Sequence, residues 1–241
     1  MMDAYTHLDL STPDPLADLR QRLREAGATR ALAIETWDGL NRPHLDSILS
    51  GEGTSLRAAL CYRNQSPREL AELLRNPRLA ALRWKASNVA GPSQALEALA
   101  QSGRWLLIHS DEGVAAMRRN LEIALNRQPG LKVFVPHFGW PRTGGVDDEG
   151  WQDAMQALSR HANVVAGLSA VEHFSREEFP HRDLYRLAAR LLAWFGPDRI
   201  VAGTDYPNCA RCNYGASLLL VHRWILEADP AWSDTNALSV D

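Results

Sequence analysis

The sequence predicts a (β/α)8 barrel, and three observations support this prediction. Eight short apolar runs alternate with helical patterns along the 241 residues, which is the element order of a parallel α/β protein. Most runs are apolar throughout, as at 105–108, which is typical of strands buried on both faces. The length and the 45% hydrophobic content suit one large domain over residues 1–241.

The predicted strands share apolar and β-branched residues, and their short lengths favour strands over buried helical turns. A proline, Pro207, follows the last of them, where it cannot continue a central strand. The eight strands are predicted at Ala4–Leu10, Arg30–Glu35, Ser55–Tyr62, Ala80–Lys85, Trp105–Ser110, Lys132–His137, Val164–Ala170 and Arg199–Asp205.

Several predicted helices begin and end at recognisable signals. Pro15 follows a possible cap at Asp14, and Gly27 ends the same helix. Ser66 and Glu69 have the spacing of a capping box. Only the connection over 37–53 has a weak helical pattern. The helices are predicted at Pro15–Ala26, Leu70–Leu74, Ser93–Ala100, Glu112–Asn126, Trp151–Ser159, Asp183–Phe195 and Gly215–Glu227.

A doubly wound open sheet is the alternative fold. It would be favoured by a glycine-rich phosphate loop directly after a strand. The glycine pair Gly51 and Gly53 instead precedes a predicted strand, so the barrel is preferred.

Composition excludes some classes of partner. The net charge of -3 and the scattered basic residues disfavour nucleic acid. No apolar stretch approaches the roughly 18 residues of a membrane helix, and no signal peptide is recognised. We therefore expect a cytoplasmic protein without a nucleic-acid or membrane partner. Tryptophans on the predicted helices leave a homo-oligomer open.

The three cysteines do not form a disulfide framework. Cys209 and Cys212 have a redox or zinc-knuckle spacing, but no second pair completes a four-sulfur site. We interpret this pair as a structural coincidence.

Polar side chains gather at the carboxyl ends of the predicted strands, where parallel barrels have their active sites. A single histidine at such a position is usually structural, but three histidines and an aspartate in one layer predict a shared site. These side chains are His7, Glu35, Tyr62, Arg63, Lys85, His109, His137 and Asp205. Neutral imidazoles and a carboxylate are typical ligands of zinc, which lowers the pKa of a bound water towards about 7.

Four motifs give the sequence a family resemblance. They are Asp3-Ala-Tyr-Thr-His7 at strand one, His137-Phe-Gly-Trp-Pro141 at strand six, Gly167-Leu-Ser-Ala170 at strand seven and 195–207 around strand eight. With these motifs the chain resembles the amidohydrolase superfamily, in particular the amidohydrolase-related branch. This branch includes 2-pyrone-dicarboxylate and fuconolactone-type lactonases and aminocarboxymuconate-type decarboxylases. The strand-eight motif is the most specific, and the resemblance spans nearly the whole chain.

The resemblance implies a role for each matching residue. It implies that His7, His109 and Asp205 bind one divalent ion, most simply zinc, and that His137 polarises the substrate or moves a proton. In a metal-free mode, Asp205 is the general base on water. Tyr5 stands where the family has its first strand-one histidine, so the absence of any metal ion is also open. The family's terminal segment is missing, and the last helix is expected to lack part of its end.

The remaining candidates concern substrate binding. Arg63 and Lys85 are expected to bind an anionic group, with an ion pair to Glu35 as the alternative. Trp84 and Trp140 are expected to wall a pocket for a flat ring, and Tyr5 to contact the substrate.

The resulting hypothesis is a hydrolase that opens a small carboxylated lactone or similar cyclic ester. A metal-dependent, non-oxidative decarboxylase of a small unsaturated or aromatic acid is the alternative enzyme. An inactive barrel that only binds a ligand is the alternative from another class.

Overall fold

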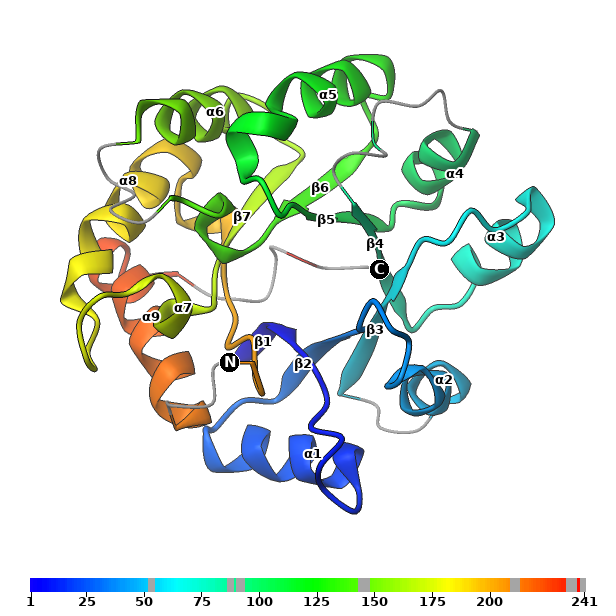
Figure 1. Cartoon of the computed structure of the whole chain (residues 1–241), viewed down its shortest axis with the longest axis horizontal. Coiled ribbons are helices and arrows are strands. Elements are labelled where there is room, and N and C mark those ends of the chain that lie inside the picture. Colours follow the sequence, from blue (N-terminus) through cyan, green and yellow to red (C-terminus); the bar gives the residue numbers. More distant parts are fainter. Residues whose placement is uncertain are drawn as a thin grey trace.

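The computed structural model describes residues 1–51, 55–85, 89, 94–142, 148–208, 213–232 and 238. Its eight strands form one parallel sheet in the order β1 to β8, which curves into a nearly closed (β/α)8 barrel (Figure 1). The strands are β1 (Met2–Thr6), β2 (Arg30–Ile34), β3 (Leu56–Cys61), β4 (Leu79–Lys85), β5 (Trp105–His109), β6 (Lys132–Val135), β7 (Val164–Leu168) and β8 (Ile200–Ala202).

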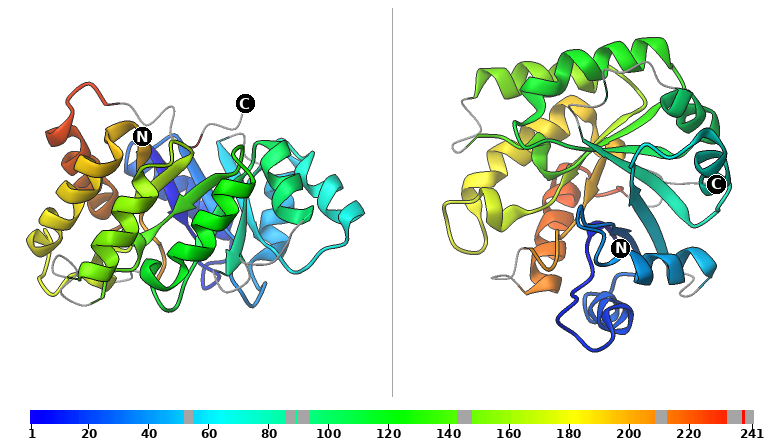
Figure 2. Two further views of the ribbon diagram at one scale, coloured as in Figure 1. Left: turned by 90° about the horizontal axis from the view of Figure 1, so that it is seen from above. Right: turned by 45° about the vertical axis from the view of Figure 1, so that its right-hand side comes forward.

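The helices form a ring outside the strands, as Figures 1 and 2 show. Each βα connection contributes a helix, and the connection after β7 contributes two. The helices are α1 (Pro15–Glu25), α2 (Arg42–Ser50), α3 (Pro67–Leu74), α4 (Gln94–Ser102), α5 (Val114–Arg127), α6 (Glu149–Ser159), α7 (Val171–Phe174), α8 (Tyr185–Phe195) and α9 (Tyr214–Ala228). Asp14 caps α1, and Ser66 and Glu69 form the predicted capping box of α3.

The core has two parts because neighbouring residues of a strand point to opposite sides of the sheet. A larger cluster includes Leu60, Leu82 and Ile108 together with apolar side chains of the helices, and it lies between sheet and helices. A smaller cluster, which includes Ile34, Leu107 and other strand residues, fills the barrel interior. The phase of each strand therefore decides which of its polar residues point inward.

The barrel closes through the residues that follow β8. The amide of Asp205 donates to the carbonyl of Tyr5 at 2.9 Å. The buried carboxylate of Asp3 accepts from the amide of Thr204 at 3.0 Å and from its hydroxyl at 2.7 Å. Gly203 lies between these contacts, so close to Tyr5 that a Cβ atom there would be 2.9 Å from the tyrosine's amide nitrogen. This close approach joins β1 to the chain that presents Asp205.

The prediction was correct in strand number and order, but several strands end earlier than predicted. β1 stops at Thr6 rather than Leu10, and β8 stops at Ala202 rather than Asp205. His7, His137 and Asp205 consequently lie just beyond strands. The weak connection after β2 contains a regular helix, α2, with Pro43 in its first turn and Gly51 as a left-handed C-cap.

Among the described residues, no helix is both long and apolar enough to cross a membrane. Cys209 and Cys212 lie outside the described residues, so their interpretation stays a prediction.

Candidate active site

His7, His137 and Asp205 meet at the carboxyl end of the barrel. Nε2 of His7 lies 3.7 Å from Oδ1 of Asp205. The ring of Tyr5, the last inward residue of β1 before His7, packs edge-on against both imidazoles, with centroid distances of 5.5 Å to His7 and 4.3 Å to His137. All four side chains are buried. Residues from three separate strand ends therefore form one compact cluster.

Left-handed backbone conformations aim two of these side chains. Asp205 has φ 62° and His137 has φ 55°, which costs free energy in residues other than glycine and concentrates at functional sites. Hydrogen bonds with adjacent segments of the same chain hold both conformations. The amide of His7 donates to the carbonyl of Tyr206 at 2.6 Å, on the other side of Asp205 from the Tyr5 contact described above.

A side chain of α6 holds the turn after β6 through a hydrogen bond. Trp151, almost fully buried, donates its indole Nε1–H to the carbonyl of Phe138 at 2.7 Å. The hydroxyl of Ser169, at the end of β7, lies 2.9 Å from Nδ1 of His137 and accepts from the histidine amide at 3.1 Å. The ring of His137 is thus held through Nδ1, which leaves Nε2 as its reactive nitrogen.

The protonation states follow from burial and hydrogen bonding. Burial raises the pKa of Asp205 to about 7, against a lowering by its bond from Asn208 and by the charge of Arg83. Burial, with the same arginine charge, lowers the pKa of His7 to about 3. Nδ1 of His7 lies 2.9 Å from the carbonyl of Ile34, which can only accept. His7 is therefore neutral, protonated on Nδ1, and presents the lone pair of Nε2 towards Asp205.

Arg83 on β4 brings a buried cation to this site and is not among the residues that the sequence predicts for it. Its guanidinium donates to the carbonyl of Glu35 at 2.8 Å and to Nδ1 of His109 at 3.3 Å. It also bonds to the hydroxyl of Tyr5 and lies over the ring of Trp37, 4.6 Å from the centroid. The side chain is only 5% exposed. Its charge reaches every titratable group of the cluster.

The signal that would have found Arg83 is present in the sequence. A charged residue interrupts the apolar run of β4, two positions before Lys85. Residues two apart share a face of a strand, so any phase that turns Lys85 inward also turns Arg83 inward. By the same alternation, Trp84 points outward.

The prediction that Trp84 walls the substrate pocket was therefore wrong. Trp84 is buried in the cluster between sheet and helices and stacks on Tyr62 at a centroid distance of 3.8 Å. Trp140 lies beside two of the histidines, since its ring is 5.6 Å from that of His137 and 5.9 Å from that of His109, and its contact with a flat substrate ring stays a prediction.

Of the two predicted anion-binding residues, Arg63 is already paired. Its Nη2 lies 3.0 Å from Oε1 of the buried Glu35, which was the alternative left open by the sequence. Arg42 approaches the same carboxylate at 3.7 Å. Lys85 has no such partner among the described residues; its Nζ lies 5.2 Å from the ring centroid of Trp37. Lys85 is the better candidate for a substrate anion.

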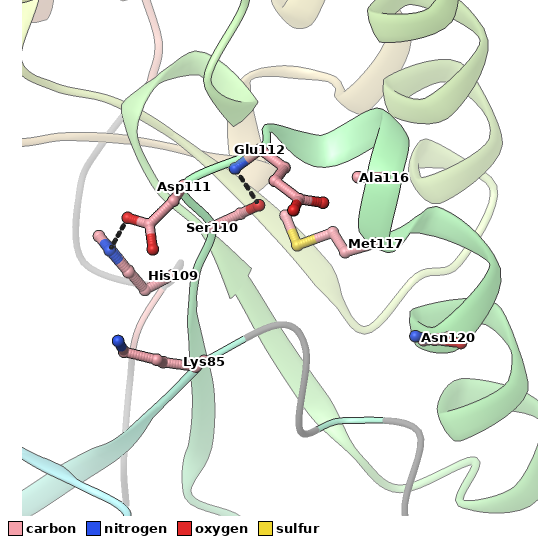
Figure 3. Close-up of a pocket in the computed structure, with 8 residues that line it drawn as sticks. All are labelled: Lys85, His109, Ser110, Asp111, Glu112, Ala116, Met117 and Asn120. Atoms are coloured by element: carbon pink, nitrogen blue, oxygen red, sulfur yellow. Dashed lines mark hydrogen bonds and ion pairs between the residues drawn. The ribbon is translucent and has the colours of Figure 1, made fainter.

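Lys85 and His109 line a pocket of about 280 Å³ beside the cluster (Figure 3). Asp111 and Glu112 line it from the start of the connection to α5, and Nε2 of His109 lies 3.1 Å from Oδ1 of Asp111. A second pocket of about 720 Å³ continues past Asp111 to Trp140. The mouth of the barrel is thus lined by polar and ionisable side chains, with the aromatic ring of Trp140 in the second pocket.

The sequence contains a family signature that covers most of this architecture. Residues 63–233 match the family model described as amidohydrolase. The chain belongs to the amidohydrolase family. The match begins at Arg63 after β3 and extends beyond α9, so it includes Arg83, His109, His137 and Asp205.

The chain is similar to a curated enzyme and to solved structures. The L-fucono-1,5-lactonase of Burkholderia ambifaria is 27% identical over 150 residues, which are 59% of this chain and 51% of the lactonase. The chain thus matches about half the length of that curated relative. A solved structure from Pseudomonas putida, assigned as a 2-pyrone-4,6-dicarboxylic acid hydrolase, has TM-score 0.74 and 21% identity and covers 94% of this chain and 93% of its own.

An amidohydrolase structure from Burkholderia multivorans with bound zinc is also similar, with TM-score 0.72, 16% identity and coverage of 95% of this chain and 92% of its own. The donor set here does not fit such an ion. Within the described residues, no three His, Cys, Asp or Glu side chains are placed to hold a metal. A guanidinium can only donate, so Nδ1 of His109 must accept from Arg83 and Nε2 must carry the proton facing Asp111. His109 has no lone pair left, and catalytic zinc sites need three protein ligands.

Proposed function

We propose that this amidohydrolase opens a small lactone or similar cyclic ester, with Asp205 as the general base on water. A carboxylated substrate is the better fit because Lys85, which has no ion-pair partner among the residues that the structure describes, offers a cation beside the cluster. The lactonase relative supports the same reaction class. The observation that carries the proposal is the pairing of a buried carboxylate with a neutral imidazole acceptor.

This pairing orients a water molecule for attack. The carboxylate of Asp205 and Nε2 of His7 are both acceptors, 3.7 Å apart, so one water can donate a hydrogen bond to each. Both protons of that water then point to the protein, and its lone pairs point to the substrate. Asp205 removes one proton as the oxygen attacks the acyl carbon. The ring of Tyr5 packs against both His7 and His137, and in this proposal His137 passes the proton taken by Asp205 on to the leaving oxygen.

A substrate panel tests the reaction class. Carboxylated pyrones, aldonolactones and simple lactones are offered in a pH-stat, since each ring opening releases a proton. Unsaturated and aromatic carboxylic acids are offered in parallel with detection of CO2. We expect ring opening of at least one lactone class, with the hydroxy acid as the product by mass spectrometry. Release of CO2 without ring opening would identify a decarboxylase, and ligand binding without turnover would identify an inactive barrel; either contradicts the proposal.

The pH dependence gives an independent prediction. Only the carboxylate form of Asp205 accepts a proton, and burial raises its pKa to about 7. We expect kcat/KM to rise about tenfold per pH unit below that value and to level off above it. Initial rates between pH 5 and 8.5, corrected for spontaneous lactone hydrolysis at each pH, measure the profile. A flat profile through this range, or activity that falls as the pH rises, would exclude Asp205 as the base.

A further inference from the structure

Arg83 is a buried cation without a counterion among the described residues. It takes part in none of the ion pairs there, and Glu35, whose backbone carbonyl it contacts, turns its carboxylate towards other partners. The Oε2 atom of Glu35 accepts from the amide of Cys61 at 2.6 Å, and its Oε1 atom pairs with Arg63. Within Glu35, Arg83 bonds to the backbone carbonyl and not to the carboxylate. A buried charge left unpaired is costly to stability, so a ligand or reacting group that needs the charge is the simplest reason for it.

The guanidinium is held rigidly and still has donors to spare. Glu35 and His109 accept from its two terminal nitrogens, Tyr5 accepts through its hydroxyl, and Trp37 covers one face. The Nε–H of Arg83 is buried without any partner among the described residues. A fixed donor group of this kind stabilises a developing negative charge without reorganising during the reaction.

Two features of this chain are linked by the arginine. Tyr5 stands at the strand-one position of a metal-binding histidine in the family motif, and its hydroxyl bonds to Arg83. His109 is the strand-five histidine, and its Nδ1 lone pair is used by the same guanidinium. Arg83 thus contacts both positions, and its positive charge would repel a divalent ion placed between them.

From these contacts we infer that Arg83, held by Tyr5 and His109, is the electrophilic group of the reaction and takes the place of a metal ion. The inference rests on the proposed lactone hydrolysis. As water attacks, its oxygen bonds to the acyl carbon, Asp205 takes the proton, and the carbonyl electron pair moves onto oxygen beside Arg83. The pair then returns, the ring C–O bond breaks, and the leaving oxygen receives the proton that Asp205 took.

Metal analysis tests the inference without any substrate. We expect protein purified without chelator to contain no stoichiometric metal and to bind no zinc in calorimetric titration. The Tyr5→His variant alone is expected to bind zinc weakly or not at all, and the Tyr5→His/Arg83→Met variant to bind about one equivalent, because the lone pair of His109 is then free. Circular dichroism confirms folding of each variant. About one equivalent of zinc in the native protein, or equal zinc affinity in both variants, would overturn the inference.

Kinetics of Arg83 variants form the second arm. We expect Arg83→Ala to lower kcat by about 10²–10³-fold, and added guanidinium ion at millimolar concentration to restore part of the loss. Arg57→Ala, a half-buried arginine at the start of β3, serves as the matched control and should be unchanged. Chelation should leave the native rate unaffected.

The outcomes separate the two proposals. If no lactone is hydrolysed, the proposed function fails. The zinc titrations then still test whether Arg83 takes the place of a metal ion. If lactones are hydrolysed but chelation abolishes the rate, or Arg83→Ala keeps the native rate, the role of Arg83 fails alone.

Discussion

Replacing Asp205 by asparagine is expected to lower kcat/KM for lactone hydrolysis by about 10³-fold, within the range that general base catalysis contributes. The amide keeps the size and the hydrogen bond from Asn208 but cannot take a proton from water. The measurement is initial rates at pH 8, where the native carboxylate is ionised.

The stability of the same variant distinguishes a catalytic role from a structural one. The pKa of Asp205 is raised by burial from its ordinary value to about 7. A pKa raised in the folded state adds stability at low pH that is lost as the pH rises through the folded value. At pH 8 the native protein has lost this contribution, so Asp205→Asn should unfold at the same temperature or higher. Asp198→Asn, in the middle of the η5 turn (Pro197–Arg199), is the control for both measurements. A variant with normal turnover, or one that loses activity only because it unfolds, would contradict the role of Asp205.

The second large effect is expected at Gly203, where the barrel closes. A Cβ atom would lie 2.9 Å from both the amide nitrogen and the Cβ atom of Tyr5 and 3.2 Å from the Cβ atom of Ser169. Tyr5 is held in β1 and Ser169 directly follows β7, so neither can move aside without distorting the barrel, and Gly203→Ala is expected to reduce the free energy of unfolding by about 3 kcal/mol. For a chain of this length that corresponds to a fall in Tm of about 6–12 °C.

Gly130→Ala is the matched control for Gly203→Ala. Its added Cβ would meet only the carbonyl of Ala100, at 3.7 Å, which is an ordinary contact. Thermal unfolding followed by circular dichroism compares the two variants. We also expect the kcat/KM of folded Gly203→Ala to fall, because a shift of Tyr5 moves the carbonyl that holds the amide of Asp205. Equal Tm values for the two alanine variants would show that the barrel closure is more compliant than the contacts imply.

Much of this fold could be predicted because its signals are local. Apolar runs such as β5 (Trp105–His109) and caps such as Ser66 act within one element, and their alternation predicts a parallel barrel before any contact is known. The weak signal at α2 (Arg42–Ser50) failed because that helix has no side-chain hydrogen bond at its N-cap, and only Leu45 and Ile48 are buried. Strand ends failed for a related reason. Asp205 closely follows the apolar run of β8 in sequence, but the strand ends at Ala202, and Asp205 itself has a left-handed backbone.

The sequence by itself determined the barrel, the order of its strands and the gathering of His7, His137 and Asp205 at one rim, because parallel strands present their carboxyl ends together. Only the tertiary structure decided which neighbours on a strand face the interior and which lone pairs are in use. Arg83 points into the barrel and Trp84 away from it because β4 pairs with β3 and β5 in one particular register. That register brings the guanidinium to Tyr5 and His109, and such contacts depend on distances between strands that no local pattern encodes.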